Sequence, residues 1–155
     1  MIGIVLAGGF GTRLAPATKV ITKQLIPIYN KPLIYYPIST LMSAGIRELV
    51  IISTRDFIPL FQDLFGNGEH LGVSIDYIIQ EKPAGIAESF LLSEKLIRGQ
   101  KVALILGDNF FYGVGLGREL SKFKEIKGAQ VFAYEVANPS DYGVVEMSET
   151  GFPIS

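Results

Sequence analysis

The sequence predicts an α/β fold: a Rossmann-like, mostly parallel sheet with helices on both faces. Two observations predict it. Short apolar runs of strand length alternate along the chain with segments whose apolar residues recur at helical spacing. The first run, Ile4-Val5-Leu6, leads directly into a loop with three glycines in four residues. Such alternation of strands and helices is typical of a parallel sheet that helices cover on both sides.

The first helix is predicted over residues 33–44, because Ile34, Ile38 and Leu41 lie on one helical face. Pro32 lies near the expected start of this helix. Pro37 is compatible with the helix only near its first turn, where a missing main-chain N–H removes no helical hydrogen bond.

The remaining elements alternate in the same way. Apolar, β-branched runs predict strands, and helical periodicity predicts helices. In chain order they are a strand over 48–53, a helix over 57–65, a strand over 73–80, a helix near 86–97, a strand over 102–106, a helix that carries Leu116, Leu120 and Phe123 on one face, a strand over 129–136 and a weaker strand over 143–147. We expect one domain that spans residues 1–155.

The composition limits the kinds of partner. The 155 residues carry 14 Lys and Arg against 15 Asp and Glu, a net charge of −1, so no basic excess points to a nucleic acid or an anionic membrane. The absence of cysteine excludes disulfides, thiolate catalysis and cysteine-ligated zinc, and fits a cytoplasmic location. No stretch approaches the roughly 20 apolar residues of a membrane span. A soluble protein that acts on a small molecule is expected.

The loop after the first strand predicts a site for a polyphosphate. Gly8, Gly9 and Gly11 let the backbone bend and let a ligand approach main-chain N–H groups. Successive N–H groups form a concave anion site, and Arg13 adds a permanent, multi-donor cation beside it. Lys23 strengthens this interpretation. The alternative is a glycine-rich turn without chemistry, since glycines mark turns in proteins of every kind.

Two familiar phosphate loops do not match. A Walker-type loop needs Gly-Lys-Ser/Thr after four intervening residues, whereas from Gly8 this spacing reaches Arg13. A dinucleotide fingerprint read from Gly9 needs a third glycine where Leu14 stands. It also needs an acidic residue after the second strand, where the sequence has Ser53-Thr54-Arg55. A dehydrogenase-like dinucleotide domain is therefore disfavoured.

Polar residues at the carboxyl ends of the other strands are further candidates, because ligands of such sheets bind there. Gln80 ends one strand and precedes the turn Pro83-Ala84-Gly85, and Asp108-Asn109 follow another. Magnesium is usually held by one or two carboxylates plus substrate phosphates, so Asp108 is predicted to be a Mg²⁺ ligand. Each segment also has a purely structural explanation, as a solvated strand end or an ordinary turn.

Several longer motifs occur together. They are Leu6-Ala7-Gly8-Gly9-x-Gly11-Thr12-Arg13-Leu14, Lys23-Gln24-Leu25-Ile26-Pro27-Ile28-Tyr29-x-Lys31-Pro32, Ile34-Tyr35-Tyr36-Pro37-x-Ser39-Thr40-Leu41-Met42, Ala44-Gly45-Ile46-Arg47-Glu48 and Leu106-Gly107-Asp108-Asn109. Through them essentially the whole chain resembles glucose-1-phosphate thymidylyltransferase, a bacterial sugar nucleotidyltransferase family that converts dTTP and glucose 1-phosphate into dTDP-glucose and pyrophosphate. The uridylyl and cytidylyl relatives share the first loop but not the Lys-Gln-Leu-x-Pro and Ile-Tyr-Tyr-Pro runs.

The resemblance implies a nucleotide site, a sugar site and a metal site. Nucleotide-binding residues would be Leu6, Ala7, Gly8, Gly9, Gly11, Thr12, Arg13, Lys23, Gln24, Gln80, Pro83, Gly85 and Asp108. Sugar-binding residues would be Leu106, Asn109, Tyr142 and Gly143. Arg13, Lys23 and Asp108 would be catalytic, with Asp108 as the Mg²⁺ ligand. Gln80 and Gly85 would read the pyrimidine, since a glutamine amide offers a donor and an acceptor that match the edge of thymine or uracil.

The implied reaction is in-line attack by a sugar-phosphate oxygen on the α-phosphorus of dTTP, with loss of pyrophosphate. Such a displacement requires positioning and charge stabilisation rather than a covalent intermediate. The sequence accordingly offers no convincing nucleophile–base pair, and its one histidine, His70, lies in a glycine-rich turn. The family also implies a homo-oligomer, with dTTP and glucose 1-phosphate as its partners.

Three residues and the length depart from the family pattern. Phe10 replaces a small or polar residue, Ala84 replaces an aspartate and Glu88 replaces a glutamine; the last two flank the expected base pocket. Family members also continue about as long again beyond this sequence, where they carry a lysine for the sugar phosphate and a second metal-binding aspartate. The chain is therefore expected to be the N-terminal portion of a longer domain, a truncated nucleotidyltransferase fold. Two alternatives stay open: a uridylyltransferase of the same family, and a nucleotide-binding module with weak or no turnover.

Overall fold

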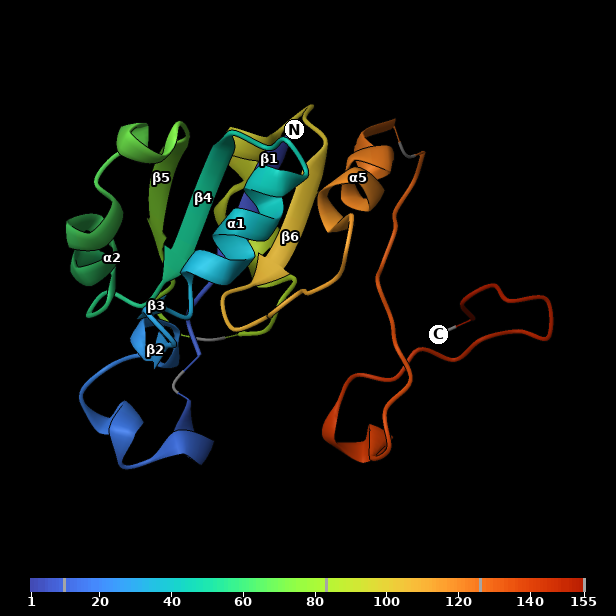
Figure 1. Cartoon of the computed structure of the whole chain (residues 1–155), viewed down its shortest axis with the longest axis horizontal. Helices are drawn as coiled ribbons and strands as arrows, with labels where there is room; N and C mark the ends of the chain where they lie inside the picture. The colour runs from blue at the N-terminus through green and yellow to red at the C-terminus, as the bar shows by residue number, and fades with distance from the viewer. Residues whose placement is uncertain (10, 83, 126, 155) are drawn as a thin grey trace. The chain divides into compact units, whose positions relative to one another are not determined.

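A four-stranded parallel sheet organises most of the chain (Figure 1). The computed structural model describes residues 1–9, 11–82, 84–125 and 127–154, and the chain divides into two units, Met1–Lys124 and Glu125–Ser155. The sheet belongs to the first unit. Its strands are β1 (Ile2–Leu6), β4 (Glu48–Ser53), β5 (Ser74–Ile79) and β6 (Val102–Leu106), in the order β5-β4-β1-β6.

The register of the sheet brings the carboxyl ends of its strands together. Leu6 at the end of β1 is paired with Ile52 of β4 on one side and with Leu106 of β6 on the other. Ser53 of β4 is paired in turn with Ile79 of β5. Whatever follows each strand therefore begins at the same edge of the sheet.

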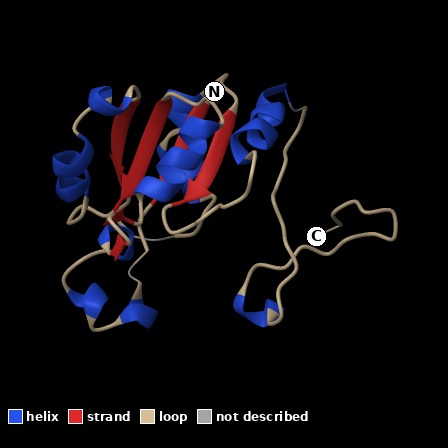
Figure 2. Ribbon diagram, in the orientation of Figure 1, coloured by secondary structure: helices blue, strands red, loops and turns tan. Residues whose placement is uncertain are grey.

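Helices cover both faces of the sheet, as predicted (Figure 2). On one face α1 (Tyr35–Ser43), α2 (Ile58–Phe65) and α5 (Leu116–Ser121) share a core with strand residues such as Val5. On the other face α3 (Glu88–Leu92) and α4 (Glu94–Ile97) share a second core with Ile4. Both strand side chains are fully buried, and burial of each aliphatic side chain is worth about 1.5–3 kcal/mol.

The first helix is shorter than predicted. It covers Tyr35–Ser43 rather than 33–44, and Pro37 occupies its third residue, within the turn where a helix needs no main-chain donor. Pro32 does not start this helix. It belongs instead to β3 (Lys31–Pro32), which pairs antiparallel with β2 (Pro27–Ile28).

The strand predictions for 48–53 and 102–106 are confirmed, and those for 73–80 and the helix over 57–65 hold within one residue at each end. The predicted helix near 86–97 is divided at Ser93. Its hydroxyl donates to the carbonyl of Ser89 at 2.6 Å, and such back-bonding is a known cause of helix bending.

Short 3₁₀ turns complete this part of the fold: η1 (Thr12–Leu14), η2 (Ala17–Lys19), η3 (Lys23–Leu25), η4 (Glu69–Leu71) and η5 (Lys122–Glu125). None of the helices in the described part of the chain is long and apolar enough to cross a membrane.

The second unit contradicts two strand predictions. Residues 129–136 have no regular secondary structure, and Val131 and Tyr134 are exposed. Of the segment 143–147, only Met147 forms a bridge, to Pro153. A strand obtains its hydrogen bonds from a neighbour, and among the described residues no strand pairs with 129–136. The unit otherwise contains the turn η6 (Pro139–Asp141).

The folded protein should lose stability in strong alkali because of the partly buried phenol of Tyr77. This phenol donates to the carbonyls of Gly66 at 2.6 Å and Phe61 at 3.3 Å, and burial raises the pKa of Tyr77 from 10.0 to about 12. Because the folded state binds this proton more tightly, the free energy of unfolding is unaffected below pH 10 and falls as the pH rises from 10 toward 12. Urea unfolding at several pH values measures this.

Tyr77→Phe should flatten that part of the stability curve, since it removes the titrating group. Tyr112→Phe, which removes an exposed phenol, is the matched control and should leave the curve in place. Equal pH dependence in Tyr77→Phe and the unsubstituted protein would contradict the prediction.

Candidate functional site

A hollow of about 200 Å³ opens where β1 and β6 end. It is lined by Gly9, Gly11, Thr12, Arg13, Leu14, Lys23 and Asp108. These residues come from three separate segments: the loop after β1, the turn η3 and the turn after β6. The parallel register brings the first and third segments together, and η3 adds the second. The structure thus unites the glycine loop, both predicted cations and the predicted metal ligand.

The glycine loop has a defined conformation and leaves several main-chain N–H groups unpaired within the described part of the chain. Gly11 has a positive φ of 58°, and a Cβ there would lie 3.0 Å from Thr18 Cγ2 and 3.1 Å from Lys23 Cβ. The Thr18 hydroxyl donates to the carbonyl of Gly11 at 2.8 Å. Among the described residues, none accepts a hydrogen bond from the main-chain N–H of Gly8, Gly9 or Gly11. These N–H groups are available to an anion.

The charged groups of the hollow remain accessible to solvent. Lys23 Nζ lies 2.8 Å from Asp108 Oδ2, and about a third of each side chain is exposed. An ion pair at such exposure contributes about 1 kcal/mol or less to folding. Arg13 is exposed and forms no ion pair within the described ranges. Arg13, Lys23 and Asp108 can therefore leave their present contacts and bind a ligand at little cost in folding free energy.

A buried glutamine lies beneath the start of the loop. Gln80 is 2% exposed, and its main-chain N–H donates to the carbonyl of Ser53 at 2.8 Å. Its side-chain Oε1 faces Gly8 so closely that a Cβ on residue 8 would lie 2.2 Å from it. Residue 8 must therefore be glycine for Gln80 to occupy this place.

Glu88, the first residue of α3, holds the other end of the Gln80 amide. Its Oε2 accepts a hydrogen bond from Gln80 Nε2 and a second one, of 3.2 Å, from the main-chain N–H of Ala84. The predicted base-reading residue Gly85 directly follows Ala84 in the sequence and has a positive φ of 99°. Sequence reasoning noted Glu88 only as a departure from the family pattern. No local signal in the sequence indicates that it contacts Gln80.

The assignment of Gln24 as a nucleotide-binding residue stays a prediction. Gln24 is 4% exposed, does not line the hollow, and accepts a hydrogen bond from the hydroxyl of buried Thr22. A Cβ on Gly107 would lie 2.9 Å from Gln24 Cγ. Gln24 therefore packs beneath the turn that carries Asp108. Sequence reasoning did not identify the supporting roles of Thr22 and Thr18.

The other predicted site residues lie at or near the same sheet edge, with three exceptions. Leu6 and Leu106 end β1 and β6, and the carbonyl of buried Ala7 accepts a hydrogen bond from Ser53 at 2.9 Å. Asn109 follows Asp108 and donates through its main chain to Leu106 at 3.0 Å. The exceptions are Pro83, which lies outside the described residues as Phe10 does, and Tyr142 and Gly143, which belong to the second unit. Their assignments stay predictions, as do the roles of all the other predicted site residues.

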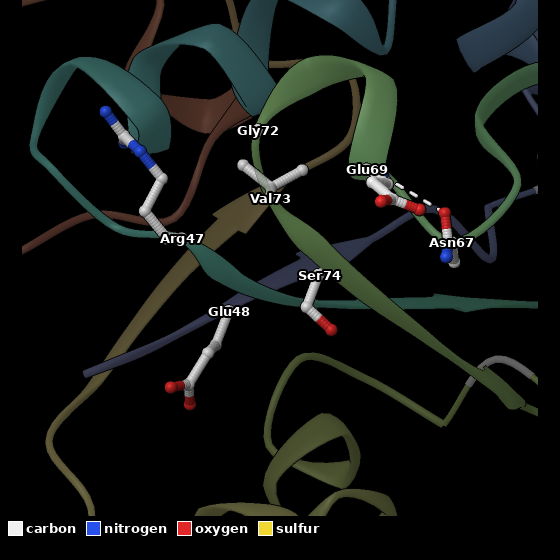
Figure 3. A pocket seen from close by; sticks show the side chains of 7 residues that line it. All are labelled: Arg47, Glu48, Asn67, Glu69, Gly72, Val73 and Ser74. Carbon is white, nitrogen blue, oxygen red and sulfur yellow. Dashed lines mark hydrogen bonds between the residues drawn. The ribbon is translucent and has the colours of Figure 1, made fainter.

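A larger hollow, of about 490 Å³, lies at the opposite edge of the sheet, where β4 and β5 begin (Figure 3). It is lined by Arg47, Glu48, Asn67, Glu69, Gly72, Val73 and Ser74. The Arg47 guanidinium donates to the carbonyls of Met42 and Ile46. No predicted site residue lines this hollow. Because ligands of parallel sheets bind at the carboxyl ends of the strands, the smaller hollow is the candidate site.

The donor set of the smaller hollow fits magnesium bound together with a phosphate. Across the described residues no group of three or more His, Cys, Asp and Glu could hold a metal by itself. Asp108 offers one carboxylate beside the open N–H groups of the glycine loop. Magnesium typically takes one or two carboxylates and completes its shell with substrate phosphates and water.

Comparison with known proteins agrees with this geometry. The family described as Nucleotidyl transferase matches residues 2–154. Glucose-1-phosphate thymidylyltransferases from Mycobacterium tuberculosis and Mycolicibacterium smegmatis are 54% and 51% identical over all 155 residues, which make up 54% of each of those proteins. The chain thus spans about half the length of the curated relatives that it matches.

Solved structures share the fold. A Bacillus anthracis protein assigned as a glucose-1-phosphate thymidylyltransferase, solved with sucrose, superposes with a TM-score of 0.86 at 33% identity, over 96% of this chain and 61% of that one. A UTP-bound UGPase from Acinetobacter baumannii has a TM-score of 0.66 at 21% identity, over 79% of this chain and 52% of that one, a likeness of fold alone. With the family match over residues 2–154, these findings show that the chain belongs to the nucleotidyl transferase family.

Proposed function

We propose that the protein is a glucose-1-phosphate thymidylyltransferase, and that residues 1–155 form the nucleotide-binding portion of a single domain. The convergence of the glycine loop, Arg13, Lys23 and Asp108 on one hollow carries this proposal. A polyphosphate with a divalent cation requires this combination of open N–H groups, cations and a carboxylate. The thymidylyltransferase relatives, aligned over the whole chain, support the choice of substrates.

In this proposal the loop and its neighbours bind the nucleotide. The N–H groups of Gly8, Gly9, Gly11 and Thr12 hold the triphosphate, with Arg13 and Lys23 against it. Gln80 and Gly85 read the pyrimidine, and Leu6, Ala7, Gln24 and Pro83 are further nucleotide-binding residues. Leu106 and Asn109, in the first unit, bind glucose 1-phosphate, and the sugar-binding role of Tyr142 and Gly143, in the second unit, is proposed from the resemblance alone. Arg13, Lys23 and Asp108 are the catalytic residues.

The proposed reaction needs positioning and charge stabilisation. A phosphate oxygen of glucose 1-phosphate attacks the α-phosphorus of dTTP and forms a new P–O bond. The bond from the α-phosphorus to the oxygen that bridges to the β-phosphorus breaks, and pyrophosphate leaves with that electron pair. Arg13 and Lys23 stabilise the negative charge of the phosphates during this exchange. Asp108 would hold Mg²⁺, which supplies further charge neutralisation when bound.

A cytoplasmic homo-oligomer is part of the same proposal. Phe110, Tyr112 and Val114 lie close together in the sequence, between β6 and α5, and their apolar side chains are exposed. Exposed apolar surface of this kind is available for contact with a second copy of the protein. Light scattering coupled to size exclusion measures the mass in solution, and a monomer at micromolar concentration would contradict the assembly.

The proposed function is tested by pyrophosphate release. The protein is incubated with Mg²⁺, glucose 1-phosphate and either dTTP, UTP or CTP, and we expect the fastest release with dTTP. Faster release with UTP would identify a uridylyltransferase of the same family. Calorimetric binding of dTTP without turnover would identify a nucleotide-binding module, and undetectable binding of every nucleotide would contradict both interpretations.

Gly8→Ala should abolish detectable dTTP binding. The added Cβ meets Gln80 Oε1 at 2.2 Å, so the buried amide or the loop must move from its place. Calorimetric titration with dTTP and Mg²⁺ measures the loss. Gly113→Ala is the matched control, because a Cβ at residue 113 has no neighbour within 4 Å. Equal dTTP affinity in Gly8→Ala and the unsubstituted protein would contradict the proposed location of the nucleotide.

Asp108→Asn should separate activity from stability. The change removes a carboxylate whose partner, Lys23, keeps about a third of its side chain exposed, so the free energy of unfolding should fall by less than about 1 kcal/mol. Loss of charge at the reaction centre should lower kcat by about 100-fold and raise the Mg²⁺ concentration needed for half-maximal rate. Steady-state kinetics over a Mg²⁺ series provides both values.

Glu119→Gln controls for the loss of an ion pair elsewhere, since Glu119 pairs with Lys122 at 2.7 Å on α5 and η5. It should leave kcat and the Mg²⁺ requirement unchanged. An Asp108→Asn protein with the Mg²⁺ dependence of the unsubstituted protein would exclude Asp108 as the metal ligand.

A further inference from the structure

We propose that Glu88 fixes the orientation of the Gln80 amide and thereby makes the site selective for pyrimidines that carry an N3–H, thymine and uracil, over cytosine. The inference rests on the proposed function, in which Gln80 reads the base. Glu88 is a positioning residue in this proposal: it contacts Gln80 rather than the nucleotide.

The contacts of Gln80 define which end of its amide faces the nucleotide loop. Nε2 donates to Glu88 Oε2, and a carboxylate oxygen accepts hydrogen bonds but donates none. A flipped amide would place Oε1 against Glu88 and bring two acceptors into contact. The carboxylate therefore selects one of the two amide orientations, the one in which Oε1 points away from Glu88 and toward Gly8.

Glu88 is itself held in place. Its Oε2 also accepts the main-chain N–H of Ala84 at 3.2 Å, so the turn before α3 and the Gln80 side chain converge on one oxygen. Gln80 is 2% exposed, which leaves its amide little room to rotate into a third arrangement. The orientation of the Gln80 amide is therefore set by Glu88, which the main-chain N–H of Ala84 holds in place.

The selected orientation leaves an acceptor for the ligand. Among the described residues no group donates to Gln80 Oε1, and this oxygen is not one of the fully buried polar atoms without a partner, so it retains contact with solvent. A base that covers this oxygen displaces the solvent, so a base that brings an N–H to it is favoured over one that brings a lone pair. Thymine and uracil present N3–H at this edge, whereas cytosine presents an unprotonated N3. The Gln80 Oε1 acceptor therefore discriminates against cytosine and does not distinguish thymine from uracil.

The first test compares nucleotide affinities in variants of Glu88. Calorimetry gives the ratio of the dCTP to the dTTP dissociation constant with Mg²⁺ present, and we expect a ratio well above one for the unsubstituted protein. Glu88→Gln keeps the shape but offers a donor as well as an acceptor, so Gln80 can adopt either orientation. The ratio should fall by roughly five- to tenfold, the equivalent of one neutral hydrogen bond. Glu88→Ala should reduce it at least as much.

Glu81→Gln is the matched control, since Glu81 is a neighbouring exposed carboxylate that pairs with Arg55 and does not contact Gln80. It should leave the ratio unchanged. A ratio near one in the unsubstituted protein, or an unchanged ratio in both Glu88 variants, would overturn the inference while leaving the nucleotide site intact. Absence of binding by every nucleotide would instead overturn the proposed function together with this inference.

A second measurement needs no variant. The unsubstituted protein is titrated with dTTP and with its N3-methyl derivative, which lacks the N3–H. We expect the methylated nucleotide to bind at least about tenfold more weakly, since it leaves Gln80 Oε1 without a donor. Equal affinity for the two nucleotides would overturn the inference even if the Glu88 variants do not fold.

Discussion

Parallel pairing of β1 with a neighbour on each side is the constraint on which the first unit depends. The register aligns Leu6 with Ile52 and with Leu106, so the loops that follow β1 and β6 start side by side. A shift of one residue would turn the buried side chains of each strand to the opposite face and would separate the glycine loop from Asp108. The apolar core and the candidate site therefore share one structural cause.

The site has two layers with different physical properties. The inner layer consists of Gln80, Gln24 and Thr22, which are buried and hydrogen-bonded to defined partners. The outer layer consists of Arg13, Lys23 and Asp108, which retain contact with solvent. Burial of a charge is expensive unless it is paired, whereas a buried neutral amide needs only hydrogen bonds. The buried residues thus define the shape of the site and the orientation of its amide groups, and the exposed residues supply its charge.

The sequence predicted the parts of the fold whose cause is local. Strands of a parallel sheet that helices cover read as continuous apolar runs, which is why 48–53 and 102–106 were found with correct bounds. The run 129–136 has a similar composition but lacks a neighbouring strand in the described chain, so its prediction was wrong. Arg13 and Asp108 could be placed together because strand ends meet at one edge. The contact between Glu88 and Gln80 depends on tertiary packing, which no spacing rule reveals.

The ion pair between Lys23 and Asp108 relates the two ligands of the proposed reaction to each other. In the free protein each side chain neutralises its partner. A triphosphate that draws Lys23 away exposes the carboxylate to a cation, and a divalent cation on Asp108 releases the ammonium group to a phosphate. By thermodynamic linkage each ligand then increases the affinity of the other by the same factor. Under the proposed function, the pair thus disfavours uptake of a metal-free nucleotide and of a bare metal ion, and it favours uptake of the nucleotide–metal complex.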